Sequence, residues 1–182
     1  MSDQLTELLR AKAVQLGTFK LASGRMSDLY VDARQVTLHS TGARLIGERI
    51  LDRLADGVVA VGGLTMGADP IVSSVSVLSN FRDQKVHGFL IRKQPKGHGA
   101  GRVIEGAANL PPGAKVTIVE DTTTTGGSLL RAVERAVEHG LQVVQCITVV
   151  DREEGAAEAL SAAGYKLEAL VTRTDLLRGG HA

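Results

Sequence analysis

Short, continuously apolar runs separated by amphipathic helical segments constrain the fold of this chain more than any other feature. The runs are rich in β-branched residues and cover Val58–Val61, Val86–Ile91, Val116–Val119 and Val143–Val150. Helical patterns stand between several of them, at Ala68–Leu78 and at Leu129–His139. In the second of these, residues 129, 132, 133, 136 and 137 form one apolar stripe. A strand that is apolar at every position is buried on both faces, so the pattern predicts an α/β fold with a central parallel sheet flanked by helices.

Two more helices are predicted ahead of the first strand. One is supported by apolar residues at helical spacing and ends at Gly17; these residues are Leu5, Leu8, Leu9, Ala13 and Leu16. The other runs from about Thr41 to Leu54. The length of 182 residues fits a single domain over residues 1–182, since a second domain would be cramped.

Composition excludes several classes of function. The 21 basic and 20 acidic residues give a formal net charge of +1, and aromatic residues make up only 3% of the chain, without tryptophan. Neither property favours binding to nucleic acid or to an anionic membrane. The single cysteine, Cys146, lies in an apolar run and is expected to be a buried, inert thiol. No apolar run approaches the roughly 20 residues of a membrane span, so we expect a cytoplasmic protein.

The segment Val116–Ser128 carries the clearest chemical signal. Its strand ends in Glu120 and Asp121, and a loop of threonines and glycines then leads into the helix at Leu129. A helix N-terminus offers unpaired N–H groups and the positive end of a dipole, which bind an anion. The loop contains no lysine, so it is not a nucleoside triphosphate loop. We expect a monophosphate there, with the carboxylates facing a polyol or a metal; the alternative is a pair of solvated acids beside an ordinary turn.

Two other loops follow predicted strands. Gly62–Gly67 is a glycine-rich turn without the GxGxxG spacing of a dinucleotide site, and a plain strand-to-helix turn is the alternative. Arg92–Arg102 interleaves basic side chains with glycines, which suits a mobile lid that closes over a polyphosphate. A solvated basic loop is the alternative for this segment.

These segments together resemble known enzymes. The pattern VxxEDTxTTGxS at Val116–Ser128 resembles the phosphoribosyl pyrophosphate signature of the type I phosphoribosyltransferases. The RKxxKxHG spacing of the lid, the segment Phe19–Asp32 and the segment Val150–Gly155 resemble the orotate phosphoribosyltransferase family over nearly the whole chain. The resemblance implies a type I phosphoribosyltransferase-like fold. Its core would span about residues 40–155, with a small hood from about residues 1–35 and the C-terminal segment.

The resemblance also implies an activity. The enzyme would transfer the 5-phosphoribosyl group from phosphoribosyl pyrophosphate to N1 of orotate, giving orotidine 5′-monophosphate and pyrophosphate in de novo pyrimidine (UMP) biosynthesis. The reaction would depend on Mg²⁺ and pass through an oxocarbenium-like transition state with inversion at C1. The metal would be carried by the substrate, not by a protein cage. The partner would be a second copy, in a homodimer whose active site is shared through the lid loop.

Residue roles follow by position in the resembling motifs. The catalytic residues would be Lys93, His98 and Asp121. Phosphoribosyl pyrophosphate would be bound by the lid residues and the acid–threonine–glycine loop, namely Arg92, Lys93, Lys96, His98, Glu120, Asp121, Thr122, Thr123, Thr124, Thr125, Gly126, Gly127 and Ser128. Backbone groups of the Gly62–Gly67 turn would cradle its pyrophosphate. Orotate would be bound by Thr124, Arg152, Tyr30 and Val31.

Two departures bear on this reading. Some relatives carry lysines where this chain has Ala22 and Met66, and neither residue can donate to a phosphate. Either the lid cations with Mg²⁺ suffice, or affinity and substrate preference differ. Three alternatives stay open: a phosphoribosyltransferase for another base, a phosphoribosyl pyrophosphate-sensing regulator, and, with least support, a Rossmann-type dinucleotide enzyme.

Overall fold

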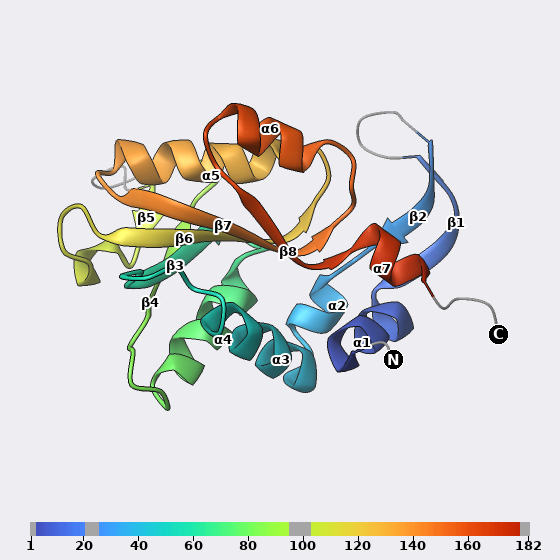
Figure 1. Cartoon of the computed structure of the whole chain (residues 1–182), viewed down its shortest axis with the longest axis horizontal. Coiled ribbons are helices and arrows are strands. Elements are labelled where there is room, and N and C mark those ends of the chain that lie inside the picture. The colour runs from blue at the N-terminus through green and yellow to red at the C-terminus, as the bar shows by residue number, and fades with distance from the viewer. Residues whose placement is uncertain (1–2, 21–25, 95–102, 179–182) are drawn as a thin grey trace.

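The computed structural model describes residues 3–20, 26–94 and 103–178 (Figure 1). Its helices are α1 (Gln4–Lys12), α2 (Arg34–Thr37), α3 (Ser40–Leu51), α4 (Asp69–Ser79), the 3₁₀ turn η1 (Ala107–Asn109), α5 (Gly127–Glu138), α6 (Ala156–Ala162) and α7 (Arg173–Leu177). Its strands are β1 (Val14–Lys20), β2 (Met26–Val31), β3 (Ala60–Leu64), β4 (His87–Ile91), β5 (Ile104–Glu105), β6 (Lys115–Thr123), β7 (Gln142–Asp151) and β8 (Leu167–Thr172).

The core is a six-stranded sheet with the order β5-β4-β3-β6-β7-β8. Strands β4, β3, β6, β7 and β8 pair in parallel, and only the two-residue edge strand β5 runs antiparallel, against β4. The predicted fold class, a central parallel sheet flanked by helices, is confirmed. Because the strands run in parallel, the loops that follow β3, β4, β6 and β7 all leave the same edge of the sheet.

Both faces of the sheet are covered, as the continuous apolar runs predicted. One cluster of buried side chains joins α1, α3 and α4 to residues such as Val61 and Val119, and the other joins α5 and α6 to residues such as Ala60 and Ile118. Figure 1 shows α5 and α6 above the sheet and α3 and α4 below it. Neighbouring residues on one strand therefore enter opposite layers, which is why the strands contain few polar positions.

The predicted helix ending at Gly17 is wrong in its second half. Helix α1 ends at Lys12, and Val14–Lys20 forms strand β1, which pairs antiparallel with β2 in a separate two-stranded sheet. Leu16 lies opposite Leu29 in this hairpin and is 71% exposed. Its helical spacing from Ala13 was coincidental, because pairing with a strand that comes later in the chain decides the local structure.

Strands β3 and β6 extend further than predicted. Gly62 and Gly63 belong to β3 and not to the turn after it, and Glu120 and Asp121 lie within β6. A Cβ atom on Gly62 would come within 2.3 Å of the Phe89 ring, so only glycine allows this close packing of side chain on strand. On α5 the predicted apolar stripe holds except at Val137, which is 49% exposed.

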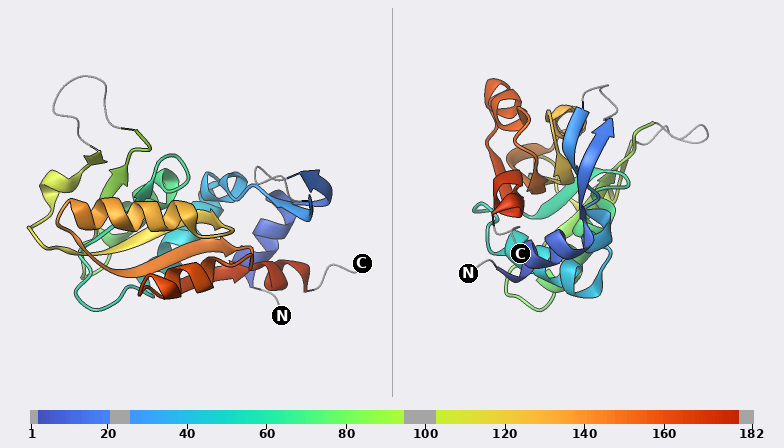
Figure 2. Two further views of the ribbon diagram at one scale, coloured as in Figure 1. Left: turned by 90° about the horizontal axis from the view of Figure 1, so that it is seen from above. Right: turned by 90° about the vertical axis from the view of Figure 1, so that its right-hand side faces the viewer.

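The C-terminal helix α7, which the sequence patterns did not predict, contacts both α1 and the hairpin. Arg10 of α1 donates hydrogen bonds to the carbonyl oxygens of Leu176 at 2.9 Å, Asp175 at 2.5 Å and Arg178. Arg173 of α7 pairs with Asp28 of β2 at 3.0 Å. Figure 2 shows α1, the hairpin and α7 together at one end of the molecule. None of the helices in the described ranges is long and apolar enough to cross a membrane.

Candidate active site

The acid pair lies where the carboxyl ends of β3 and β6 meet. Glu120 and Asp121 line a cavity of about 250 Å³, together with Arg34, Leu64, Thr65, Met66, Gly67, Lys93, Thr122 and Ser128. The turn after β3 forms one wall of this cavity, and its Thr65–Met66 peptide bond is cis. A Cβ atom on Gly67 would lie 2.7 Å from a carboxylate oxygen of each acid, so the backbone of the turn packs directly on the pair. The motifs after two different strands thus form one site.

Glu120 holds its proton more tightly than an ordinary glutamate. Burial, the neighbouring charge of Asp121 and a side-chain hydrogen bond to Asp121 raise the pKa of Glu120 to about 8, against the opposing effect of Lys93. Asp121 is oriented by the backbone N–H of Thr122, which donates to its Oδ1 at 2.7 Å. Near neutral pH the pair therefore holds one proton between two carboxyl groups.

The threonine–glycine loop encloses a second cavity of about 180 Å³ at the N-terminus of α5, lined by Glu120, Thr122, Thr123, Thr124, Thr125, Gly126, Gly127, Ser128, Leu129 and Arg131. Gly126 has φ +81°, and a Cβ atom there would also come within 3.0 Å of the Leu160 side chain. The buried hydroxyl oxygen of Thr122 has no hydrogen-bond partner within the described ranges. The Thr123 hydroxyl instead donates to Thr148 at 2.9 Å. The acid cavity thus adjoins this second cavity, which has the hydrogen-bond donors that an anion requires.

The described part of the lid begins beside the acid pair. Lys93 lines the acid cavity, and its charge acts on Glu120. Arg92 instead pairs with Glu105 of β5 at 2.8 Å, and its backbone N–H donates to Val103 across the base of the lid at 2.8 Å. Arg135 of α5 donates to the carbonyl oxygens of Arg92 and Lys93. Lys96 and His98, like Ala22, lie outside the described residues.

Of the residues predicted to bind a base, Arg152 follows β7 directly and contacts strand β2. Arg152 is 4% exposed and donates to the carbonyl oxygen of Leu29 in β2 at 3.0 Å. It also pairs with Glu154 at 2.8 Å, and its backbone N–H donates to Thr123 at 2.9 Å. The fold therefore brings Arg152 against the strand that contains Tyr30 and Val31, although 123 positions separate Arg152 from Leu29.

Comparison with known proteins agrees with this geometry. Residues 37–163 match the model of the phosphoribosyl transferase domain family. The chain is 45% identical over 178 residues to the orotate phosphoribosyltransferase of Rhodopirellula baltica, covering 94% of this chain and 91% of that protein. The chain belongs to the orotate phosphoribosyltransferase family.

Solved structures of the family share the fold. Crystal structures of the orotate phosphoribosyltransferase of Mycobacterium tuberculosis superpose with a TM-score of 0.82 at 41% identity for the Fe(III) dicitrate complex, over 96% of this chain and 97% of that one. The complex with phosphoribosyl pyrophosphate gives a TM-score of 0.78 at 38% identity, over 95% and 96%. As in the predictions from sequence, the fold is that of the type I phosphoribosyltransferases.

Two cations of this orotate phosphoribosyltransferase were missed by the sequence analysis. Arg34 of α2 lines the acid cavity, and Arg131 of α5 lines the phosphate-loop cavity and donates to Ser128 at 3.1 Å. A helical spacing of three residues from Ser128 could have indicated Arg131. Nothing local indicated Arg34, because it reaches the acid pair only through the fold.

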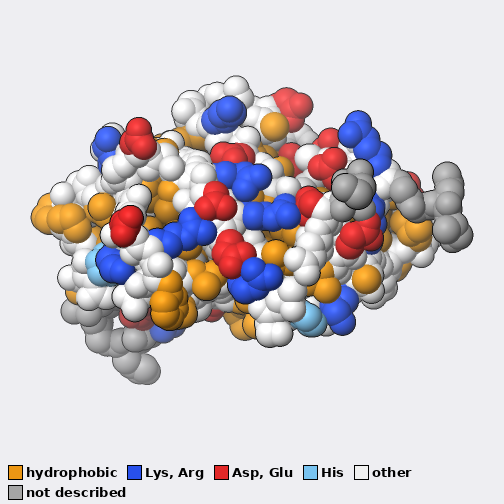
Figure 3. Space-filling model, turned by 60° about the horizontal axis from the view of Figure 1, so that its bottom comes forward, with side chains coloured by type: hydrophobic (Ala, Val, Ile, Leu, Met, Phe, Trp, Pro, Cys, Tyr) orange, Lys and Arg blue, Asp and Glu red, His pale blue; other side chains and the backbone are white. Residues whose placement is uncertain are grey.

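The charges outside the site are mixed. On the face shown in Figure 3, acidic and basic side chains lie next to one another across the middle of the surface. Ion pairs of α3 contribute to this pattern, such as Arg44–Glu48 at 2.7 Å and Arg49–Asp3 at 2.7 Å. Such a surface produces no strong field of one sign.

Proposed function

We propose that this chain catalyses the reaction of its family, the transfer of the phosphoribosyl group from phosphoribosyl pyrophosphate to N1 of orotate. The observation that carries the proposal is the convergence of three subsites at one edge of the sheet. They are the phosphate loop at α5, the acid pair of β6, and Arg152 packed against β2. Each subsite matches one part of the reacting pair: the 5′-phosphate, the ribose and the base.

The sugar phosphate would be held by the loop and the acid pair. The residues Thr122 to Ser128 surround the cavity at the N-terminus of α5, a 12-residue helix whose dipole favours an anion. Glu120 lines both cavities, and Asp121 lines the acid cavity. Ribose hydroxyls would donate hydrogen bonds to their carboxylate oxygens. We expect this arrangement to hold C1 of the ribose near the turn at Thr65–Gly67.

The leaving pyrophosphate would then lie on the side of that turn and of Lys93. Lys93 supplies positive charge there, and we propose that Arg92, Lys96 and His98 add to it when the lid closes, with Lys93, His98 and Asp121 acting at the reacting atoms. Glu120 and Asp121 are the carboxylates that would face Mg²⁺ carried by the substrate, and this ion would supply positive charge for the leaving group. Glu120 and Asp121 suit a sugar that carries Mg²⁺, because carboxylates lining a cavity accept hydrogen bonds from sugar hydroxyls and attract a cation. Among the described residues, no cluster of three His, Cys, Asp or Glu side chains forms a separate metal cage.

Orotate would occupy the space between Arg152 and the hairpin. Its carboxylate would pair with the Arg152 guanidinium in competition with Glu154, which now accepts from the same side chain at 2.8 Å. Backbone groups near Tyr30 and Val31 would bind the edge of the pyrimidine, and Thr124 would contact its other side. Since Arg152 is anchored through Leu29, the hairpin and the carboxylate-binding group are positioned together.

Catalysis would rest on positioning and electrostatics. Breakage of the bond between C1 and pyrophosphate builds positive charge on the ribose, and ionised Asp121 and Glu120 would stabilise it. Orotate N1 would attack from the opposite face and lose its proton to solvent, so the configuration at C1 inverts. The electron pair of the broken bond leaves with pyrophosphate, whose added charge the lid cations bind.

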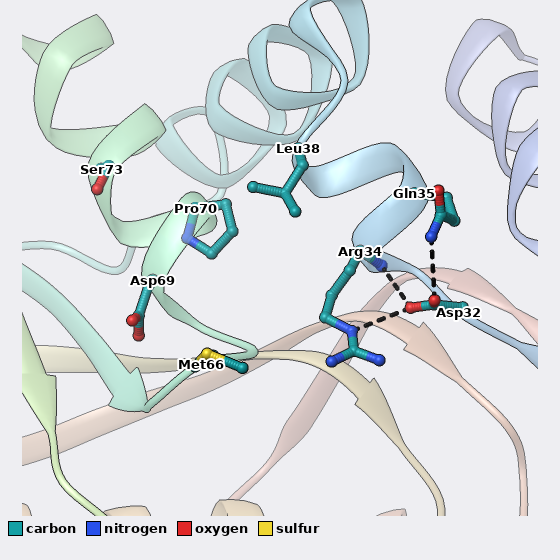
Figure 4. A pocket seen from close by; sticks show the side chains of 8 residues that line it. All are labelled: Asp32, Arg34, Gln35, Leu38, Met66, Asp69, Pro70 and Ser73. Atoms are coloured by element: carbon teal, nitrogen blue, oxygen red, sulfur yellow. Dashed lines mark hydrogen bonds and ion pairs between the residues drawn. The ribbon is translucent and has the colours of Figure 1, made fainter.

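We also propose that the enzyme is a homodimer and acts in the cytoplasm. Large apolar side chains are exposed at Leu38 and Met66, beside the acid cavity, and at Val77 and Phe81, late in α4 and just after it. Burying them against a second copy would remove apolar surface from water. Leu38 and Met66 also line the cavity of about 590 Å³ drawn in Figure 4, which opens beside the acid cavity. Size-exclusion chromatography with light scattering on Val77→Glu tests the dimer, and cell fractionation tests the location.

The proposal is tested with an ultraviolet assay containing phosphoribosyl pyrophosphate and Mg²⁺, in which orotate, uracil, adenine, guanine and xanthine are compared. Conversion of orotate alone, lost without Mg²⁺, is the expected result. Conversion of a different base would keep the sugar-phosphate subsites and overturn the role of Arg152. Binding of phosphoribosyl pyrophosphate without conversion of any base would instead identify a regulator.

A further inference from the structure

Arg34 lies at the boundary between two cavities of the molecule. It lines the acid cavity with Glu120 and Asp121, and it also lines the larger cavity of Figure 4. Met66 is the other residue that lines both. The side chain of Arg34 therefore stands beside the acid pair without belonging to the loop or the lid.

Asp32 fixes the orientation of this side chain. It accepts from Arg34 Nε at 3.0 Å and from the Arg34 backbone N–H at 3.3 Å, while Gln35 Nε2 holds its other oxygen at 3.2 Å. Figure 4 shows the guanidinium extending from α2 toward the sheet, with both Nη atoms beyond the Asp32 contact. Within the described ranges no acceptor takes a hydrogen bond from either Nη atom, so an oriented pair of donors faces the cavity.

Two basic side chains stand beside the acid pair in this cavity. Hydrogen bonding and charge from Asp32, followed by the charge of Asp121, raise the pKa of Arg34. Among described residues that line the acid cavity, Arg34 and Lys93 are the cations, and Met66 offers only an apolar thioether. A guanidinium with two free Nη atoms matches two oxygens of a phosphate group.

We propose that Arg34 binds the pyrophosphate group of the substrate through its Nη atoms and, with Lys93, supplies the charge that the turn at Met66 lacks. This inference rests on the proposed function, because it takes the acid cavity to hold ribose and pyrophosphate. Asp32 then acts as a positioning residue that keeps the guanidinium turned toward the cavity.

The proposal is tested by calorimetric titration of the whole chain with magnesium pyrophosphate, which requires no turnover. Arg34→Gln should weaken binding about 10- to 100-fold, the effect of one or two charge-assisted hydrogen bonds. The matched control is Arg44→Gln, which removes an arginine whose partner is Glu48 on the same helix. Unchanged pyrophosphate affinity in Arg34→Gln would overturn the proposal.

Kinetics and a second-site variant separate binding from a structural role. In Arg34→Gln, KM for phosphoribosyl pyrophosphate should rise by a similar factor while KM for orotate stays within about twofold. Adding Met66→Lys to Arg34→Gln should restore much of the pyrophosphate affinity, because it returns a cation to the same cavity. A rise confined to KM for orotate would instead show that Arg34 only positions the N-terminal segment. The absence of recovery with Met66→Lys, in a folded double variant, would show the same. If the wild-type chain binds magnesium pyrophosphate but converts no base, the proposed function fails, and the affinity of Arg34→Gln still decides whether Arg34 binds pyrophosphate.

Discussion

The carboxyl of Glu120 shares a buried pocket with Asp121, so one proton must leave before both acids can face a sugar and its metal. The pKa of Glu120 is about 8 in the free protein, chiefly because of burial. Binding of a positively charged metal complex and ribose hydroxyls favours the ionised form. In the absence of substrate, the proton on Glu120 thus removes part of the negative charge of the site, and substrate binding should displace this proton.

Substrate binding should therefore release a proton. Titration of phosphoribosyl pyrophosphate with Mg²⁺ at pH 7, in buffers with different ionisation enthalpies, should show between about half and one proton released per site. The release should shrink above pH 8, where Glu120 is already ionised. Equal observed heats in all buffers would contradict the assignment of a shared proton to this pair.

The same group should make stability depend on pH. Between the ordinary glutamate pKa of 4.5 and the folded value of about 8, the unfolded chain loses this proton and the folded chain keeps it. The Glu120 contribution to the free energy of unfolding is therefore full below pH 4.5, falls as pH rises through this window, and is flat above it.

Glu120→Gln should remove this decrease in the free energy of unfolding with rising pH. Relative to the wild type, the variant should gain stability between pH 5 and pH 8.5, by at least about 1.4 kcal/mol, the value of one pKa unit. Denaturant melts at the two pH values measure this difference. A parallel pH dependence of both proteins would show that Glu120 titrates normally.

At the scale of the element, two glycines of one segment should respond in opposite ways to a methyl group. Gly62 lies inside β3 against Phe89, while Gly67 lies in the following turn against the two carboxylates. Gly62→Ala should cost about 1–3 kcal/mol of stability through overpacking, with any active fraction binding normally. Gly67→Ala should displace the acid pair and lower kcat/KM at least about 100-fold, with a smaller loss of stability.

Thermal melts and steady-state kinetics on both variants check this pair of outcomes. Equal losses of stability and activity in the two variants would show that the turn serves only the packing of the sheet. The comparison matters because both glycines belong to the stretch that, from sequence, was assigned to one turn.

Short-range patterns predicted the central elements well, and long-range pairing explains what they missed. The runs that became β3, β4, β6 and β7 are apolar because both faces are buried, and that property is visible in the sequence alone. The first half of strand β1, up to Gly17, is predicted as helix from sequence because its partner β2 lies beyond an intervening segment. Strand β8, with half-buried positions, lacks the continuous apolar pattern.

The candidate site divides in the same way. Glu120, Asp121 and the threonine–glycine loop were found because the residues that bind one phosphate and one sugar are adjacent in the chain. Arg34 was not found, since only the fold brings it to the cavity that Asp121 also lines. Arg152 was placed only through the family resemblance, and its contact with Leu29 is a property of the fold.

At the scale of the whole molecule, the proposed dimer makes a prediction about mixed subunits. If the lid of one subunit closes over the site of its partner, Lys96→Ala and Asp121→Asn both fall on the same site of a mixed dimer and leave the other site intact. Mixing the two inactive variants should then restore up to about a quarter of wild-type activity, because half the dimers are mixed and each has one intact site. Absence of recovery after verified subunit exchange would show that each subunit completes its own site.

The hood also imposes an order of events on synthesis of the chain. Arg10 finds its partners 165 to 168 positions later, in and beyond α7, and Leu29 finds Arg152 123 positions later. While the chain grows from its N-terminus, strands β3 to β7 can already pair, but the first 31 residues lack the groups that hold them. The proposed pocket for the base would therefore be complete only after α7 has been synthesised, whereas the proposed loop for the sugar phosphate could form before it. Phosphoribosyl pyrophosphate is accordingly the substrate that a nascent chain could bind first.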